Sequence, residues 1–212
     1  MNIKLGNYNV YVKIIYKNNR NMYFRFDENA VLIVTCPKHT LNDEISRLIS
    51  KNEDALIKMY EKALQNQKYS EEFWYLGNKY NIVYDENIEI VKFDEDNIYV
   101  KDDDMLDDFI DDEILRVFNE EIDICKNCFV SLPEFTLKVR KMKTRWGVCN
   151  RKDNIITLNT ELIKKKVELI DYVIIHEMAH FYEGNHSKNF WAIVESACPN
   201  YKIRRAELRK WK

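Results

Sequence analysis

Hydrophobic and polar residues alternate over much of the first forty positions of the chain. In "YNVYVKIIY" and "NMYFRFD" the apolar side chains fall at every second position, which is the period of a strand with one buried face. The run "AVLIVTC" is almost entirely apolar and is followed by Pro37, so it predicts a short buried strand that ends there. The N-terminal region is therefore expected to be rich in strands.

Beyond Pro37 the apolar spacing changes to three and four residues. Residues 41–65 carry an apolar stripe that predicts an amphipathic helix, in one or two pieces. Further short strands are predicted over 73–85 and 88–100, around turns. Residues 105–129 again place their apolar side chains on one stripe and predict a long helix.

After Pro133 the alternation returns. Residues 135–150 predict a strand and residues 155–159 a returning strand, so 135–159 is expected to be a hairpin. Residues 160–184 predict a helix that begins at Thr160 or later and stops at Gly184-Asn185. A short helix over 187–198 and a basic tail complete the pattern.

These patterns divide the chain into a strand-rich region with one amphipathic helix, residues 1–104, and a second region, residues 105–212. The two regions either stand apart or form one compact unit. Hydrophobic residues make up 46% of the chain, and it contains only 4 Gly and 3 Pro, so a substantial core is expected rather than a low-complexity protein.

Charge is distributed unevenly along the chain. Residues 1–123 contain 26 acidic and 15 basic side chains, whereas residues 124–212 contain 9 acidic and 18 basic. Such a contrast fits either an intramolecular match or a basic surface for an anionic partner. The acidic run at 94–113 is expected to be a linker or a solvated helix start, since acidic side chains favour the first turn of a helix.

Cysteine usage and the apolar runs indicate a compartment. The five cysteines are an odd number, no secretory signal precedes them, and no run approaches the roughly 18 apolar residues of a membrane helix. We therefore expect a cytoplasmic protein with free thiols and no membrane partner. The C-x-x-C pair at Cys125 and Cys128 lacks a second pair, and both are expected to be buried or incidental thiols.

The stretch "HEMAHFYEGNH" holds three of the chain's four histidines. His176 and His180 stand four residues apart, so on a helix they share one face and can grip one metal ion. Glu177 follows the first of them and is placed to act as general base on a metal-activated water, the H-E-x-x-H arrangement. Catalytic zinc keeps three protein ligands and one open position, so a third ligand is needed.

His186 is the favoured third ligand, because Gly184 and Asn185 tolerate a left-handed backbone that would turn the chain back beneath the metal. Glu195 is the rival donor. A non-catalytic metal site is a further alternative, although it would not need Glu177. The metzincin pattern is excluded, because Glu183 replaces its glycine and no methionine follows Met178.

With these residues in view, the chain resembles the YgjP-like family of predicted metal-dependent hydrolases, which are related to the SprT-like and WLM metallopeptidases. The matching segments are "RWGVCNRKDNIITLN", "IDYVIIHEMAHFYEGNHSKNFW" and "PNYKIRRAELRKW", and the N-terminal strands and helix are similar as well. The resemblance implies an α+β fold of the zincin-like metallohydrolase type, with an N-terminal β-rich region. It implies zinc on His176, His180 and His186, Glu177 as base, and a strand bearing Trp146 and Gly147 near the cleft.

Residue chemistry adds to this likeness. A glycine within a strand, such as Gly147, indicates a bulge or a close backbone approach, and an edge strand there could pair with an extended peptide. Trp146 is equally explained by core packing. The donors that could stabilise developing negative charge are Tyr182, Tyr201, Arg204 and Arg205. We place Arg205 with Trp146 and Gly147 as candidate substrate contacts, although both arginines also fit a solvated tail.

Three functions remain open from the sequence. The first is a zinc-dependent metallopeptidase acting on a peptide or protein, with another divalent metal as an alternative to Zn²⁺. The second is a hydrolase of a phosphoanhydride such as a nucleoside triphosphate, which the basic half would suit although no Gly-rich phosphate loop is present. The third is a nucleic-acid-binding module with a structural metal, in which Trp146, Trp191 and Trp211 would stack on bases.

Overall fold

The computed structural model describes residues 2–27 and 29–211, and among these all side chains except those of 66 and 68–71. Contacts divide the chain into two compact units, Met1–Glu72 and Phe73–Lys212. The division predicted from the sequence lies at 104/105, so residues 73–104 belong to the second unit instead. The reason is a contact between distant parts of the chain: the Leu76 N–H donates to the Ile163 carbonyl at 2.8 Å, which ties this segment to the C-terminal half.

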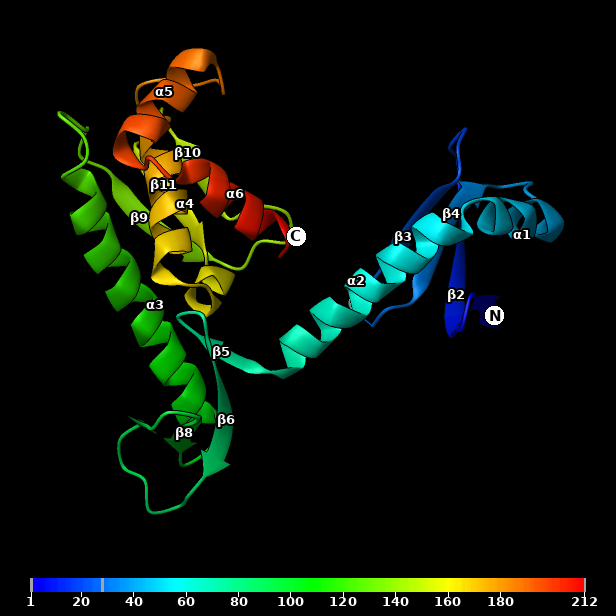
Figure 1. The fold of residues 1–212 in the computed structure, drawn as a ribbon, viewed down its shortest axis with the longest axis horizontal. Coiled ribbons are helices and arrows are strands. Elements are labelled where there is room, and N and C mark those ends of the chain that lie inside the picture. Colours follow the sequence, from blue (N-terminus) through cyan, green and yellow to red (C-terminus); the bar gives the residue numbers. More distant parts are fainter. Residues whose placement is uncertain (1, 28, 212) are drawn as a thin grey trace. The chain divides into compact units, whose positions relative to one another are not determined.

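The first unit is a four-stranded sheet with two helices. Its order is β1-β2-β4-β3, with β2 and β4 parallel and the other neighbours antiparallel. The elements are β1 (Asn2–Leu5), β2 (Tyr8–Lys17), β3 (Tyr23–Phe26), β4 (Leu32–Pro37), α1 (Asn42–Lys51) and α2 (Glu53–Glu71). The helix predicted over 41–65 is thus in two pieces (Figure 1).

Alternation along the strands builds the core of this unit. Val10 and Val12 of β2 are buried together with Leu32 and Val34 of β4, and apolar residues of the helices pack against them, among them Ile45. Exposed residues occupy the alternate positions of β1, β2 and β3. The period-two pattern read from the sequence therefore has its physical cause in one buried sheet face.

The second unit begins with a small sheet and a long helix. The sheet has the order β5-β6-β8-β7, and its strands are β5 (Phe73–Tyr75), β6 (Asn78–Tyr84), β7 (Lys92–Phe93) and β8 (Asn97–Val100). Helix α3 (Asp103–Lys126) begins where the Asp102 carboxylate accepts a hydrogen bond from the Met105 N–H at 2.9 Å. The acidic run at 94–113 therefore contains a turn, strand β8 and a capped helix start.

A three-stranded sheet follows α3, and its topology differs from the predicted hairpin. β9 (Thr136–Arg140), β10 (Gly147–Asn150) and β11 (Ile155–Asn159) have the order β10-β11-β9. Only β10 and β11 form an antiparallel hairpin, whereas β9 pairs in parallel with β11. Asn159 explains the break, because its side-chain amide donates to the carbonyls of Met142 and Arg145, both at 2.8 Å, and holds the chain away from strand geometry.

Four helical elements complete the second unit. They are the 3-10 helix η1 (Thr160–Lys164), α4 (Val167–Ala179), α5 (Lys188–Ala197) and α6 (Tyr201–Arg209). The tail expected after residue 198 is helical, because Tyr201 and Leu208 are buried on one face and anchor α6. No helix among the described residues combines the length and apolar character needed to cross a bilayer.

Helix α4 lies at the centre of this unit. It packs against α3, α5, α6 and the β10-β11 hairpin (Figure 1). Ile170, Ile174 and Met178 are fully buried, and most of its other side chains are buried as well. A helix buried on nearly all sides is normally apolar throughout. The polar residues near its C-terminal end are therefore costly to place there and point to function.

Candidate metal centre and cleft

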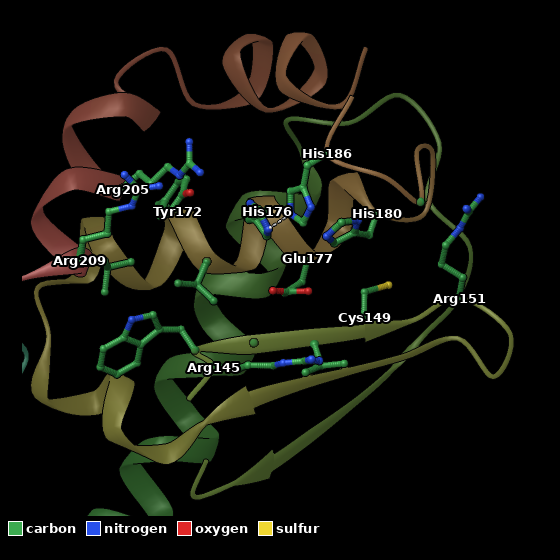
Figure 2. Close-up of a pocket in the computed structure, with 16 residues that line it drawn as sticks. Arg145, Cys149, Arg151, Tyr172, His176, Glu177, His180, His186, Arg205 and Arg209 are labelled. Carbon is green, nitrogen blue, oxygen red and sulfur yellow. Dashed lines mark hydrogen bonds between the residues drawn. The ribbon is translucent and has the colours of Figure 1, made fainter. Parts of the chain in front are cut away.

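Three histidine rings meet at the C-terminal end of α4. His176 lies in its last turn, His180 is its C-cap residue, and His186 comes from the loop before α5. The Nε2 atoms of His176 and His186 lie 3.0 Å apart, and Figure 2 shows the three rings facing one another. One nitrogen from each ring lies within 4.8 Å of the others. The structure thus brings together the three residues that the sequence singles out as ligands.

The turn that returns His186 differs from the predicted one. Helix α4 ends at Ala179, and neither Gly184 nor Asn185 has a positive φ. The residue instead lies close to Arg151: a Cβ on Gly184 would be 2.6 Å from Nη1, the end of a flexible side chain. The next helix then begins at once, because Oγ of Ser187 accepts a hydrogen bond from the Phe190 N–H at 3.2 Å.

An aromatic residue of α5 supports all three rings. The Phe190 ring centroid lies 4.9 Å from that of His176, 4.5 Å from that of His180 and 4.7 Å from that of His186. Phe190 is fully buried. Packing of this kind fixes ring orientation without adding a polar group. The role of Phe190 was not anticipated from the sequence, although its position just after the Ser187 cap places it on the first turn of α5.

Burial and one hydrogen bond hold His180 in a state suited to metal binding. Its Nδ1 lies 3.1 Å from the carbonyl oxygen of Glu183, so the tautomer with hydrogen on Nδ1 donates to that carbonyl and leaves Nε2 as an acceptor. Burial lowers the pKa of His180, which favours the neutral imidazole. Such an outer partner is common for metal-binding histidines.

The spacing of these nitrogens fits a single zinc ion. Zn–N bonds of about 2.0–2.1 Å in a tetrahedral arrangement place the nitrogens roughly 3.3 Å apart. The 3.0 Å between His176 and His186 is close to that value. Among the described residues, these histidines are the one group of three His, Cys, Asp or Glu side chains whose donor atoms converge. Glu195, the rival ligand, instead lies 3.4 Å from Nζ of Lys202.

Glu177 lies beside the histidines and is almost fully buried, with 6% of its surface exposed. Burial raises its pKa to about 7, against opposing effects from a hydrogen bond with the Cys149 backbone and from the charge of Arg145. A carboxyl group whose pKa lies near neutrality can both accept and release a proton. The observed burial therefore suits Glu177 to acid-base chemistry.

Strand β10 reaches Glu177 only because residue 147 is glycine. A Cβ on Gly147 would lie 2.7 Å from Cγ and 2.8 Å from Oε1 of Glu177. No side chain fits at those distances, so the backbone approach predicted from a glycine within a strand is present. β10 is also at the edge of its sheet, with β11 as its partner on one side.

A cavity of about 600 Å³ opens over the histidines and Glu177. Trp146, Gly147 and Arg205, the predicted substrate contacts, all line it. Trp146 also packs against the hydrophobic core of the second unit. Core packing and a place in the cavity wall are therefore compatible for this residue. Figure 2 shows Arg205, Arg209 and Tyr172 on the His176 side and Arg151 on the His180 side.

The other candidate donors make contacts elsewhere. The Tyr182 hydroxyl donates to the Ser131 carbonyl. The Tyr201 ring stacks on that of Trp191 with centroids 5.3 Å apart. Arg204 lies 3.9 Å from an Asp171 carboxylate oxygen. None of these three residues lines the cavity, which leaves Arg205 alone of the four predicted donors.

Eight cavity residues were not singled out from the sequence, and four of them are the arginines and tyrosine Arg145, Arg151, Arg209 and Tyr172. Tyr172 precedes His176 by four residues and Arg209 follows Arg205 by four, so helical spacing alone could have found both. Arg145 and Arg151 flank β10. The Arg145 carbonyl accepts a hydrogen bond from the Asn159 amide, and Nη2 of Arg151 donates to the Phe181 carbonyl at 3.4 Å, and neither contact follows from local spacing. Burial raises the pKa of Tyr172 to about 12, so its hydroxyl keeps its proton.

The indole rings proposed as base-stacking platforms are engaged within the chain. The Arg205 guanidinium lies 4.4 Å from the Trp191 ring centroid. Nζ of Lys165 lies 3.9 Å from the centroid of Trp211 and 5.3 Å from that of Trp146. Each of the three indoles therefore has a cation of the same chain against its ring.

A buried acidic residue beside three converging histidines, on an α+β scaffold, defines a metal-dependent hydrolase. Residues 20–211 match the family model described as "YgjP-like, metallopeptidase domain". The chain belongs to this YgjP-like metallopeptidase family. The α+β fold and the family resemblance expected from the sequence are thereby confirmed, and the protein is a metal-dependent hydrolase.

Two solved structures are similar to parts of the chain. The abylysin metallopeptidase zymogen of Pyrococcus abyssi is 23% identical over 43% of this chain and 90% of its own, with a TM-score of 0.41. The jannalysin metallopeptidase zymogen of Methanocaldococcus jannaschii is 19% identical over 45% of this chain and 95% of its own, with a TM-score of 0.34. No curated protein matches the chain significantly.

Proposed function

We propose that this protein is a zinc-dependent peptidase in which His176, His180 and His186 hold the ion and Glu177 is the general base. The observation that carries the proposal is the convergence of three imidazole nitrogens within 4.8 Å next to a carboxyl group that is 6% exposed. Three imidazoles leave one position of a tetrahedral zinc open, which is the arrangement of a catalytic rather than a structural site.

The proposed chemistry assigns a proton path to Glu177. Bound zinc would supply Lewis-acid polarisation and lower the pKa of a water molecule. Glu177 accepts the proton of the attacking water at its carboxylate and then gives it to the leaving amine. Its pKa of about 7 favours both transfers at neutral pH. Gly147 keeps the carboxylate in place by allowing β10 to approach it.

Strand β10 and the neighbouring hydrogen-bond donors would align the substrate. The free edge of β10 offers backbone N–H and carbonyl groups to an extended peptide. Tyr172, protonated at all physiological pH values, lies one turn before His176 and is a donor for negative charge that develops on the substrate. This arrangement matches a peptide or protein substrate.

A phosphoanhydride substrate is the second candidate, and the four arginines that line the cavity favour it. One experiment separates the two. Zinc-loaded wild type and Glu177→Gln are incubated with a mixture of peptides and, separately, with nucleoside triphosphates. We expect peptide cleavage by the wild type and a loss of at least about 10²-fold in the variant.

Glu195→Gln is the matched control, because Glu195 is exposed and paired with Lys202 away from the cavity. It should cleave peptides like the wild type. Phosphate or pyrophosphate release without peptide cleavage would transfer the assignment to the second candidate. Full peptide cleavage by Glu177→Gln would refute the proposed role of this residue.

A further inference from the structure

The cavity has a strongly unequal charge. Four arginines line it, Arg145, Arg151, Arg205 and Arg209, and Glu177 is the one acidic residue among its lining side chains. Within the part of the chain that the structure describes, no carboxylate lies within ion-pair distance of these four guanidinium groups. Arg204, the neighbour of Arg205, shows the contrast, because it lies 3.9 Å from Asp171.

Two of these arginines form a pair on one side of the cavity. Arg205 and Arg209 stand four residues apart on α6 and project toward the same side, next to Tyr172 (Figure 2). Arg151 lies on the opposite side, beyond His180. A peptide that crosses the histidines therefore has the Arg205–Arg209 pair on one side of its reacting bond.

Arg205 is held in place rather than free to rotate. Its guanidinium lies 4.4 Å from the Trp191 ring centroid, and Trp191 stacks on Tyr201 at an interplanar angle of 16°. A planar guanidinium that stacks on an indole keeps its edge available for two parallel hydrogen bonds to a carboxylate. Most of the conformational entropy of the Arg205 side chain is therefore lost on folding rather than on ligand binding.

Unpaired cations in a concave site concentrate positive potential and attract anions. A carboxylate that enters gains charge-assisted hydrogen bonds, whereas a lysine or arginine of a substrate meets like charge. Glu177 is a single carboxyl group against the four guanidinium groups that line the cavity, so the balance of charge for a substrate side chain stays positive.

We propose that the Arg205–Arg209 pair binds a carboxylate of the substrate, so that the enzyme selects peptides with an acidic group near the cleaved bond. This inference rests on the proposed peptidase function. The carboxylate is either an Asp or Glu side chain or the free C-terminus of the peptide, since both present the same group to the two guanidinium groups.

Matched peptides test the selectivity and identify the source of the carboxylate. All peptides share one cleavable sequence. At each position that flanks the cleaved bond, the residue is Glu, Gln or Lys. Every peptide is made with a free and with an amidated C-terminus. We expect kcat/KM for the preferred acidic form to exceed that of its neutral isostere by about 10- to 100-fold, the range for hydrogen bonds to charged groups. Amidation abolishes the preference only if the C-terminus supplies the carboxylate.

Charge reversal at the pair supplies the decisive variant. Arg205→Glu/Arg209→Glu should lose the acidic preference and favour the Lys peptide. Lys210→Glu is the control, because Lys210 is exposed at the end of the same helix and does not line the cavity. It should keep the acidic preference and the wild-type activity. Circular dichroism and zinc content verify that each variant is folded and loaded.

Peptide affinity for the zinc-loaded Glu177→Gln protein provides a readout that does not require turnover. The acidic peptide should bind about 10-fold or more tightly than its Gln isostere, and Arg205→Gln added to this background should remove the difference. Equal affinity and equal cleavage of acidic and neutral peptides would overturn the inference. Selective binding of acidic peptides without any cleavage would support the carboxylate site and refute the proposed peptidase function.

Discussion

Gly147→Ala tests how closely β10 approaches Glu177, the proposed general base. The added Cβ would lie 2.7 Å from Cγ, 2.8 Å from Oε1 and 3.0 Å from Cδ of Glu177. Carbon atoms in contact normally lie about 3.5–4.0 Å apart, so the side chain must move by roughly 1 Å. Gly147 has no positive φ, and alanine is therefore compatible with the backbone itself.

The displacement has separable effects on activity and stability. A misplacement of roughly 1 Å at a reacting group costs about 10²-fold in rate, and overpacking costs about 1–3 kcal/mol of folding free energy. Zinc content should not change, because the three histidines lie on other elements. We expect kcat/KM for peptide cleavage to fall about 10²-fold in a protein that remains folded and carries its metal.

Gly184→Ala is the matched comparison. Its Cβ would lie 2.6 Å from Nη1 of Arg151, which is the end of a flexible side chain and can move aside. The loss of activity should therefore be much smaller than for Gly147→Ala. If Gly147→Ala, folded and loaded with zinc, kept kcat/KM within about threefold of the wild type, the close approach to Glu177 would have no catalytic importance.

Three further predictions concern stability, each measured by urea unfolding. Ser187→Ala removes the cap that accepts from the Phe190 N–H, and should cost about 1 kcal/mol; an unchanged midpoint would contradict this. Asn159→Ala removes four buried hydrogen bonds and should cost at least about 2 kcal/mol; a loss below roughly 0.5 kcal/mol would refute its structural role. Burial raises the pKa of Asp171 to about 7, so the folded state keeps a proton that the unfolded chain releases near pH 4. The free energy of unfolding of the wild type should therefore fall from pH 4 to 7, and Asp171→Asn should flatten that slope. Equal slopes for the wild type and the variant would contradict a raised pKa of Asp171.

Local spacing predicted the parts of the site that lie on one helix and the loop after it. His176, Glu177 and His180 follow from helical geometry alone, and His186 is close enough in sequence to return. The expected left-handed turn at Gly184 and Asn185 was wrong, because backbone bonds after Ala179 close the helix without a positive φ. The short sequence separation predicted that His186 would lie near His176 and His180, but it did not predict the backbone conformation of the loop between them.

Non-local contacts account for what the sequence did not predict. The hairpin expected over 135–159 fails because Asn159 captures backbone groups of the 142–145 loop, and no periodicity reports such a contact. The expected basic tail is a helix because one apolar face is buried, and that burial carries Arg205 and Arg209 to the cavity. These arrangements depend on packing between segments distant in sequence, which alternation cannot reveal.

X-ray absorption at the zinc edge tests the central proposal most directly. For zinc-loaded wild type, we expect three imidazole nitrogens and one further light atom at about 2.0–2.1 Å. Glu177→Gln should give the same spectrum, and His186→Ala should reduce the imidazole count to two. A wild-type spectrum with fewer than three imidazoles, or one that His186→Ala leaves unchanged, would refute the proposed zinc site of three histidines.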